Sequence, residues 1–247
     1  GESSVRNGQE ENVVYSRHGL EDVVAAVELC RRRGARDVRP VGLCSGAYFA
    51  MKSAAATSHV AGFVAINPLT FDKPPPGPTD YPRVRAAREA ARYRHAVRDI
   101  EKWKKLFRGK VRLKAAATTL AGHLAGRVMK QARDVSRRLN IPWEGDVGAE
   151  LARLARNNVE QRFVFASGDP GNQLLRDEAG SVVKELEARG ILAVEIIEGT
   201  DHTFTALWSH DPLVEVLTTA IAPADAVAPA DDERDGQDSA AKRRSSR

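Results

Sequence analysis

The sequence is poor in cysteine and has no long apolar run, and each shortage excludes a class of protein. Two cysteines among 247 residues, Cys30 and Cys44, are too few for a disulfide framework, and no Cys/His cluster has the spacing of a zinc site. No stretch approaches the roughly eighteen consecutive apolar residues that suggest a membrane-spanning helix. Residues 1–16 are polar and lack the apolar core of a signal peptide. We therefore expect a cytoplasmic protein without a membrane span, a metal or another cofactor.

Short apolar runs alternate with helical patterns along most of the chain. Hydrophobic residues make up 42% of the sequence and charged residues 29%, as in ordinary soluble proteins. The strands are expected at 37–43, 60–67, 162–166 and 191–199, and the helices at 17–33, 48–56, 175–190 and 212–222. Strands that are apolar throughout and alternate with helices favour a parallel sheet covered on both faces. The pattern predicts an α/β fold with about four parallel strands in this chain.

A basic segment interrupts this alternation. It begins at residues 73–82, a stretch with five prolines that we interpret as a linker or hinge. Residues 83–138 contain eighteen Lys and Arg against four Asp and Glu, whereas the rest of the chain is acidic on balance. We expect an α/β core over 13–72 and 159–222, a basic helical cap insertion over 73–158, and flexible termini over 1–12 and 223–247.

The stretch "VGLCSGA" at residues 41–47 has the spacing of a nucleophile elbow, with cysteine in place of serine. Gly42 and Gly46 flank Cys44 as G-x-C-x-G, because side chains at those positions would crowd a sharp turn between a strand and a helix. The turn would expose Cys44 at a helix N-terminus, where a thiolate is favoured. The backbone N–H of Ser45 would then be a donor to an oxyanion. The alternative is a tight turn that carries a small buried cysteine without chemistry.

An acid and a histidine follow two later strands, in the chain order that an elbow nucleophile requires. Asp169 comes directly after the strand expected at 162–166, and His202 comes directly after the next strand. Asp201 is the second candidate for the acid, behind Asp169, because adjacent residues in a loop seldom point at each other. Asp177, which we place near the start of a helix, is the third. The remaining histidines are better explained by structural roles: His18, His59, His95, His123 and His210.

Together these residues predict a nucleophilic site. Loops at the carboxyl ends of parallel strands converge on one edge of the sheet, which is where ligands bind in such folds. His202 would take the thiol proton, Asp169 would hold the imidazole in the required tautomer, and Cys44 would attack a carbonyl carbon.

Four motifs in order, "VGLCSGAYFA", "INPLTF", "FASGDPG" and "GTDHTFT", resemble the α/β-hydrolase superfamily. The cysteine at the elbow is similar to dienelactone hydrolases and to the exosortase-associated hydrolases of bacterial exopolysaccharide clusters. "GLCSGA" and "DHTFT" resemble more closely the exosortase-associated group and its serine-aminopeptidase-like relatives. The resemblance implies Cys44, Asp169 and His202 as triad positions, a cap inserted before the acid-bearing strand, and hydrolysis of an ester or thioester.

The sequence departs from that family in two ways. The family has several strands before the elbow strand, and an early loop supplies a second oxyanion donor. Here the residues that precede the elbow strand at 37–43 predict one helix and no strand. We therefore expect the N-terminal strands of the sheet to be missing here. Pro40 also interrupts the elbow strand, where a central strand would need its N–H. If the strand next to the elbow strand is missing, Pro40 leaves no hydrogen bond of the sheet unmade and destabilises it less.

The basic insertion admits two interpretations. Its Lys and Arg can form the solvated faces of cap helices, or its formal charge of about +14 can attract an anionic partner. Candidates are the phosphopantetheine arm of coenzyme A, an acidic acyl carrier protein and an anionic polysaccharide. Nucleic acid is not expected, because aromatic residues are few here and no base-reading motif is present.

Two functions of different classes remain open. The leading hypothesis is an esterase, thioesterase or acyltransferase that acts on a small acyl substrate through a Cys44 acyl-enzyme. The alternative is a non-catalytic, incomplete α/β-hydrolase-like module that binds an acidic partner through its basic cap.

Overall fold

The computed structural model describes residues 15–72, 128–129, 131–137, 139, 141 and 143–222. The chain forms these elements in order: α1 (Arg17–Arg32), β1 (Val41–Leu43), α2 (Ser45–Ala56), β2 (Gly62–Ile66), α6 (Val147–Arg156), β3 (Glu160–Ala166), α7 (Pro170–Ala188), β4 (Leu192–Ile197), a 3₁₀ turn η1 (Leu207–Ser209) and α8 (His210–Ile221).

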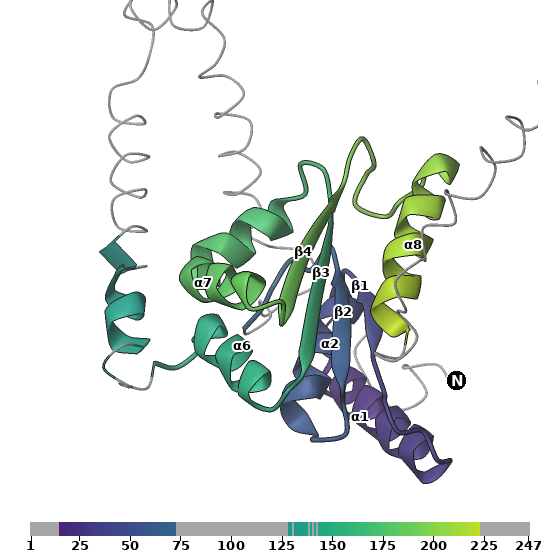
Figure 1. Cartoon of the computed structure of the whole chain (residues 1–247), viewed down its shortest axis with the longest axis horizontal. Coiled ribbons are helices and arrows are strands. Elements are labelled where there is room, and N and C mark those ends of the chain that lie inside the picture. The colour runs from purple at the N-terminus through teal and green to yellow at the C-terminus, as the bar shows by residue number, and fades with distance from the viewer. Residues whose placement is uncertain are drawn as a thin grey trace, which may run out of the picture.

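The four strands form one parallel sheet in the order β1-β2-β3-β4 (Figure 1). Each strand therefore lies beside the strand that precedes it in the chain, and a helix makes each crossover. This confirms the predicted α/β class and the parallel sheet of about four strands.

Helices cover both faces of the sheet, as the apolar strands predicted. On one face α1, α2, α6 and α7 enclose the larger core, whose largest fully buried side chains include Phe163, Phe165 and Leu151. On the other face α8 covers a smaller cluster that contains Val164 and Phe204. Burial on both sides explains why β2 and the second half of β3, from Phe163 to Ala166, are apolar at successive positions rather than at alternate ones.

β1 is the short edge strand of the described sheet. Pro40 lies directly before it and contributes its carbonyl oxygen, which accepts from the Val64 N–H at 3.0 Å. Val41 and Leu43 are 41% and 37% exposed, whereas every residue of β2 is buried. An edge position tolerates Pro40, because no strand of the described part of the chain requires its missing N–H.

Three helices begin earlier than expected. α2 begins at Ser45 rather than at residue 48, and α8 begins at His210. α7 begins at Pro170, because Asp169 is its N-cap and a proline fits the first helical position. Asp177, which we placed near a helix start, lies inside α7.

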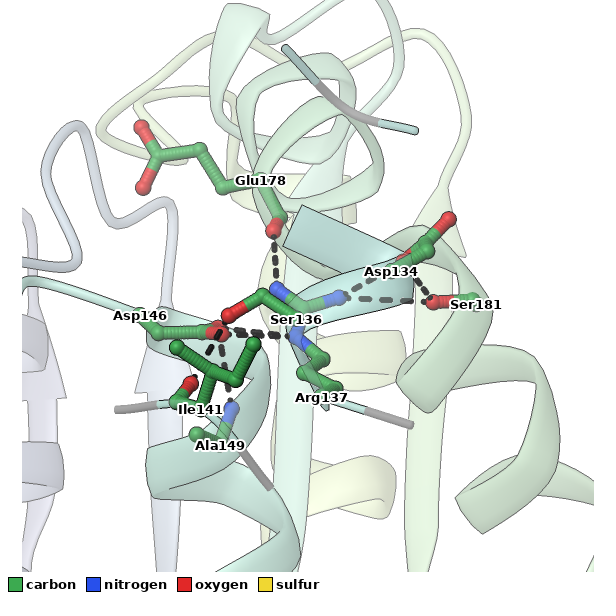
Figure 2. A network of polar contacts seen from close by, with 8 residues as sticks. All are labelled: Asp134, Ser136, Arg137, Ile141, Asp146, Ala149, Glu178 and Ser181. Atoms are coloured by element: carbon green, nitrogen blue, oxygen red, sulfur yellow. Dashed lines mark hydrogen bonds and ion pairs between the residues drawn. The ribbon is translucent and has the colours of Figure 1, made fainter. Parts of the chain in front are cut away.

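Most of the predicted insertion, 73–158, lies outside the described residues, but its end forms part of the main core. Residues 147–156 form α6, whose buried side chains pack with β3 and α7. Arg137 connects the start of α6 to α7 (Figure 2). Its Nε donates to the Asp146 carboxylate at 2.9 Å, and its Nη2 donates to the Glu178 carbonyl at 2.9 Å. Asp146 also caps α6 by accepting from the Ala149 N–H.

Candidate active site

Cys44 occupies a strained turn between β1 and α2. Its φ of 57° and ψ of −111° lie in a region that residues with a side chain seldom adopt. Its N–H donates to the Ile66 carbonyl at 2.9 Å, which holds the turn to the end of β2. Because α2 begins at the next residue, Ser45, the turn places the Cys44 side chain beside a helix N-terminus, whose partial charge favours an anion.

The two flanking glycines have different roles. A Cβ at Gly42 would lie 2.1 Å from the carbonyl carbon and oxygen of Gly46 and 2.6 Å from the Ala47 nitrogen, so the backbone leaves no room for a side chain. A Cβ at Gly46 would meet no atom of the described residues within 4 Å. The predicted crowding is therefore present at Gly42 but not at Gly46. The backbone of Gly46 is instead the obstacle to a side chain at Gly42.

Asp169 lies in the loop after β3 and is almost fully buried, with 2% of its side chain exposed. Its two carboxylate oxygens have separate partners. Oδ1 accepts from the Gly171 N–H at 2.8 Å and so caps α7, and Oδ2 accepts from His202 Nδ1 at 2.6 Å. A cap and a charge-assisted hydrogen bond thus fix one carboxylate in one orientation.

His202 lies in the loop after β4, with 26% of its side chain exposed. The hydrogen bond to Asp169 is the main reason why its pKa rises from 6.5 to about 9, and the Cys44 side chain is the second. Burial opposes the rise, because it disfavours the charged imidazolium. The loops after β1, β3 and β4 therefore bring the three predicted residues together at one edge of the sheet.

The alternative acid next to His202 is engaged elsewhere. Asp201 accepts from the Thr205 N–H at 2.9 Å and from the Thr205 hydroxyl, which also lowers the pKa of its carboxyl. Asp201 thus shapes the loop, and Asp169 is the carboxylate that binds His202.

The other histidines of the described part have structural contacts. His18 bonds Glu21 at the start of α1, and His210 donates to the Phe204 carbonyl. His59 lies against the Arg31 guanidinium at the far end of α1. His95 and His123 lie outside the described residues.

Sequence reasoning missed one residue that contacts this site. Asn67 is fully buried directly after β2, and its Nδ2 donates to the His202 carbonyl at 2.7 Å. In the sequence, Asn67 stands between an apolar strand and Pro68. This pattern is typical of a turn and does not indicate a contact with His202.

The described residues contain no group of three or more His, Cys, Asp or Glu side chains that could hold a metal ion. None of their helices has the length and hydrophobicity of a membrane-spanning segment. A cavity of about 550 Å³ opens between β4 and α8 beside Trp208, but none of the three predicted residues lines it.

No family model and no curated protein matches this sequence. A solved structure from a study of carboxylesterases of the ammonia-oxidizing thaumarchaeon Nitrososphaera gargenis is similar to this chain at 15% sequence identity. The similarity covers 81% of this chain and 72% of that one, with a TM-score of 0.36. What this chain does is therefore inferred from its own side chains.

Proposed function

We propose that this protein is a hydrolase or acyltransferase that acts on an ester or thioester through Cys44, His202 and Asp169. The observation that carries the proposal is the 2.6 Å hydrogen bond from His202 Nδ1 to the buried Asp169 carboxylate, with Cys44 close enough to raise the pKa of the same imidazole. A histidine held by an acid and facing a thiol on a strained turn is the arrangement that activates a nucleophile.

The proton on His202 determines the order of the first steps. Because the pKa of His202 is about 9, the imidazole is protonated at neutral pH and can stabilise a Cys44 thiolate. The thiolate attacks the acyl carbon and forms an S–C bond, while the carbonyl π electrons move to the oxygen. The tetrahedral intermediate then collapses, the bond to the leaving group breaks, and His202 Nε2 gives its proton to the departing oxygen or sulfur.

The second half of the cycle uses the neutral imidazole left by the first half. His202 takes a proton from water, whose oxygen attacks the acyl–Cys44 thioester, and the thiolate and imidazolium re-form as the acid leaves. An alcohol, amine or thiol in place of water would make the same enzyme an acyltransferase. In both halves the Ser45 N–H, at the start of α2, is the proposed donor to the oxyanion.

Steady-state hydrolysis of nitrophenyl esters and acyl thioesters tests this function. Cys44→Ala should abolish turnover, and Asp169→Asn should lower kcat by about 10³–10⁴-fold because the imidazole loses its tautomer and orientation. Cys30→Ala is the matched control, since Cys30 is an exposed cysteine of α1, and it should leave kcat unchanged. Turnover by Cys44→Ala at the wild-type rate would exclude the proposal.

The alternative, a non-catalytic module that binds an acidic partner, is favoured by the charge of the insertion. Eighteen Lys and Arg against four acids over residues 83–138 suit an acidic acyl carrier protein or the phosphates of coenzyme A. The same partner could deliver an acyl thioester to Cys44, which would join the two functions in a cytoplasmic thioesterase. Binding of acyl carrier protein by a chain that hydrolyses none of the esters or thioesters would favour the module alone.

A further inference from the structure

We propose that Asn67 is a positioning residue that fixes His202 relative to Asp169 and Cys44. The inference rests on the proposed function, because it assigns Asn67 a part in aligning the same three side chains. Asn67 touches none of the proposed reacting atoms and acts through the backbone carbonyl of His202.

Asn67 is held in an unusual backbone conformation at the end of β2. It is 0% exposed and its φ is +46°, a left-handed value that asparagine tolerates better than most residues with a side chain. Its N–H donates to the Val164 carbonyl at 2.8 Å, which extends the pairing of β2 with β3 by one residue. The backbone of Asn67 is therefore fixed by the sheet.

Both halves of the Asn67 carboxamide are used. Oδ1 accepts from the Ala166 N–H at 2.8 Å, and Nδ2 donates to the His202 carbonyl at 2.7 Å. Ala166 is the last residue of β3, and its own carbonyl accepts from the Asp169 N–H at 2.9 Å. One buried amide thus links β2 to the turn that carries Asp169 and to the backbone of His202.

This link matters because the bond between His202 and Asp169 has a narrow geometric tolerance. The Nδ1–Oδ2 distance is 2.6 Å, and misplacement of a catalytic group by about 1 Å can cost 10²-fold in rate. Two other hydrogen bonds hold the loop after β4, which carries His202. The Thr205 N–H donates to Asp201 within the loop, and His210 of α8 donates to the Phe204 carbonyl. The Asn67 bond joins it to the sheet that also carries Cys44.

Asn67 is neutral, so its influence on His202 must pass through geometry rather than charge. The charged or titratable groups around the imidazole are Asp169 and Cys44, which raise its pKa, and Asp201 in the same loop, which faces Thr205. If Asn67 is removed, the imidazole should move away from Asp169 and lose part of the effect of that carboxylate.

The test compares Asn67→Gly with a matched control, Gln161→Ala. Glycine accepts a φ of +46° without strain, so Asn67→Gly deletes both side-chain bonds and spares the backbone. Gln161 is 2% exposed, and its Nε2 donates to the Leu151 carbonyl at 2.9 Å at the opposite end of β3. Both variants therefore lose a buried amide that binds a backbone carbonyl, and only one of them is next to His202.

Two readouts that do not require substrate turnover decide the question. In Asn67→Gly, the NMR titration of His202 should move from about pH 9 toward the ordinary 6.5. Alkylation of Cys44 by iodoacetamide at pH 7 should slow by about tenfold or more, with the exposed Cys30 as internal standard. In Gln161→Ala, neither quantity should change, although the protein loses stability.

The proposal is overturned if a folded Asn67→Gly keeps the wild-type titration and alkylation rate, or if Gln161→Ala changes both by the same amount. If Asn67→Gly fails to fold, NMR of the wild-type Asn67 carboxamide supplies the test. Its protons should exchange slowly with solvent, and their chemical shifts should change as His202 titrates. Rapid exchange without such a change would overturn the proposal. A wild-type chain that hydrolyses no ester or thioester would contradict the proposed function, whereas the His202 titration would still decide the role of Asn67.

Discussion

At the scale of single residues, Cys44 combines backbone strain with a charged neighbour. A non-glycine residue in its conformation costs on the order of 1–3 kcal/mol, which the surrounding turn must offset. The offset comes from fixed contacts: the Cys44 N–H binds β2, and Gly42 lets α2 begin against β1. We interpret the strain as the means by which the thiol is presented at the helix N-terminus.

The two elbow glycines should respond oppositely to alanine. Gly42→Ala would force its Cβ into the backbone of Gly46 and Ala47, so we expect a loss of about 1–3 kcal/mol in the free energy of unfolding and slow alkylation of Cys44. Gly46→Ala meets open space among the described residues and should stabilise α2 by about 0.5–1 kcal/mol, because alanine favours a helix. Urea denaturation measures both; equal losses at the two positions would contradict this assignment.

At the scale of elements, the segment before α6 is fixed to the core through a buried charge pair. The Asp146 side chain is 4% exposed and Arg137 14%, and the arginine also binds Asp134 at 2.9 Å. Gly148 lies directly against this guanidinium: a Cβ there would be 2.5 Å from its central carbon. The absence of a side chain at Gly148 thus allows the arginine to reach the start of α6.

Replacing Arg137 should therefore lower the free energy of unfolding far more than replacing an exposed arginine. Arg137→Met leaves Asp146 buried without its charged partner, and we expect a loss of about 3–5 kcal/mol in the free energy of unfolding. The matched control is Arg189→Met, whose pair with Glu185 is 52% and 66% exposed and should contribute at most about 1 kcal/mol. Similar losses in the two variants, measured by urea denaturation, would contradict the structural role of Arg137.

Sequence patterns predicted the strands, and the loops in which the candidate residues lie, better than the helix boundaries. Continuous apolar runs marked β2 and the second half of β3, because these stretches are buried on both faces, and residues that follow parallel strands must meet at one edge of the sheet. The start of α7 was missed because Asp169 was considered only as an acid and not as an N-cap. The contact of Asn67 with His202 joins residues 135 positions apart, which no local pattern can reveal.

At the scale of the whole molecule, charge and chemistry lie in different parts of the chain. The three proposed catalytic residues lie in the acidic α/β core, whereas the excess of Lys and Arg lies in residues 83–138. If the insertion recruits an acidic carrier, added salt should raise KM for carrier-bound thioesters and leave kcat nearly unchanged. Salt screens the attraction between the carrier and the basic insertion, whereas it has little effect on the buried His202–Asp169 pair. Small neutral esters are the control and should show no salt effect on KM.

The proposed function requires that Cys44 forms a covalent acyl-enzyme. Rapid quenching with acid, followed by intact-mass and peptide analysis, detects this intermediate. After brief reaction with a nitrophenyl ester, we expect one acyl group per chain, on the peptide that contains Cys44, and no acylation of Cys30. The acyl group should also form far more slowly in Asp169→Asn. Turnover without an acylated Cys44, or acylation of Ser45 in its place, would exclude Cys44 as the nucleophile.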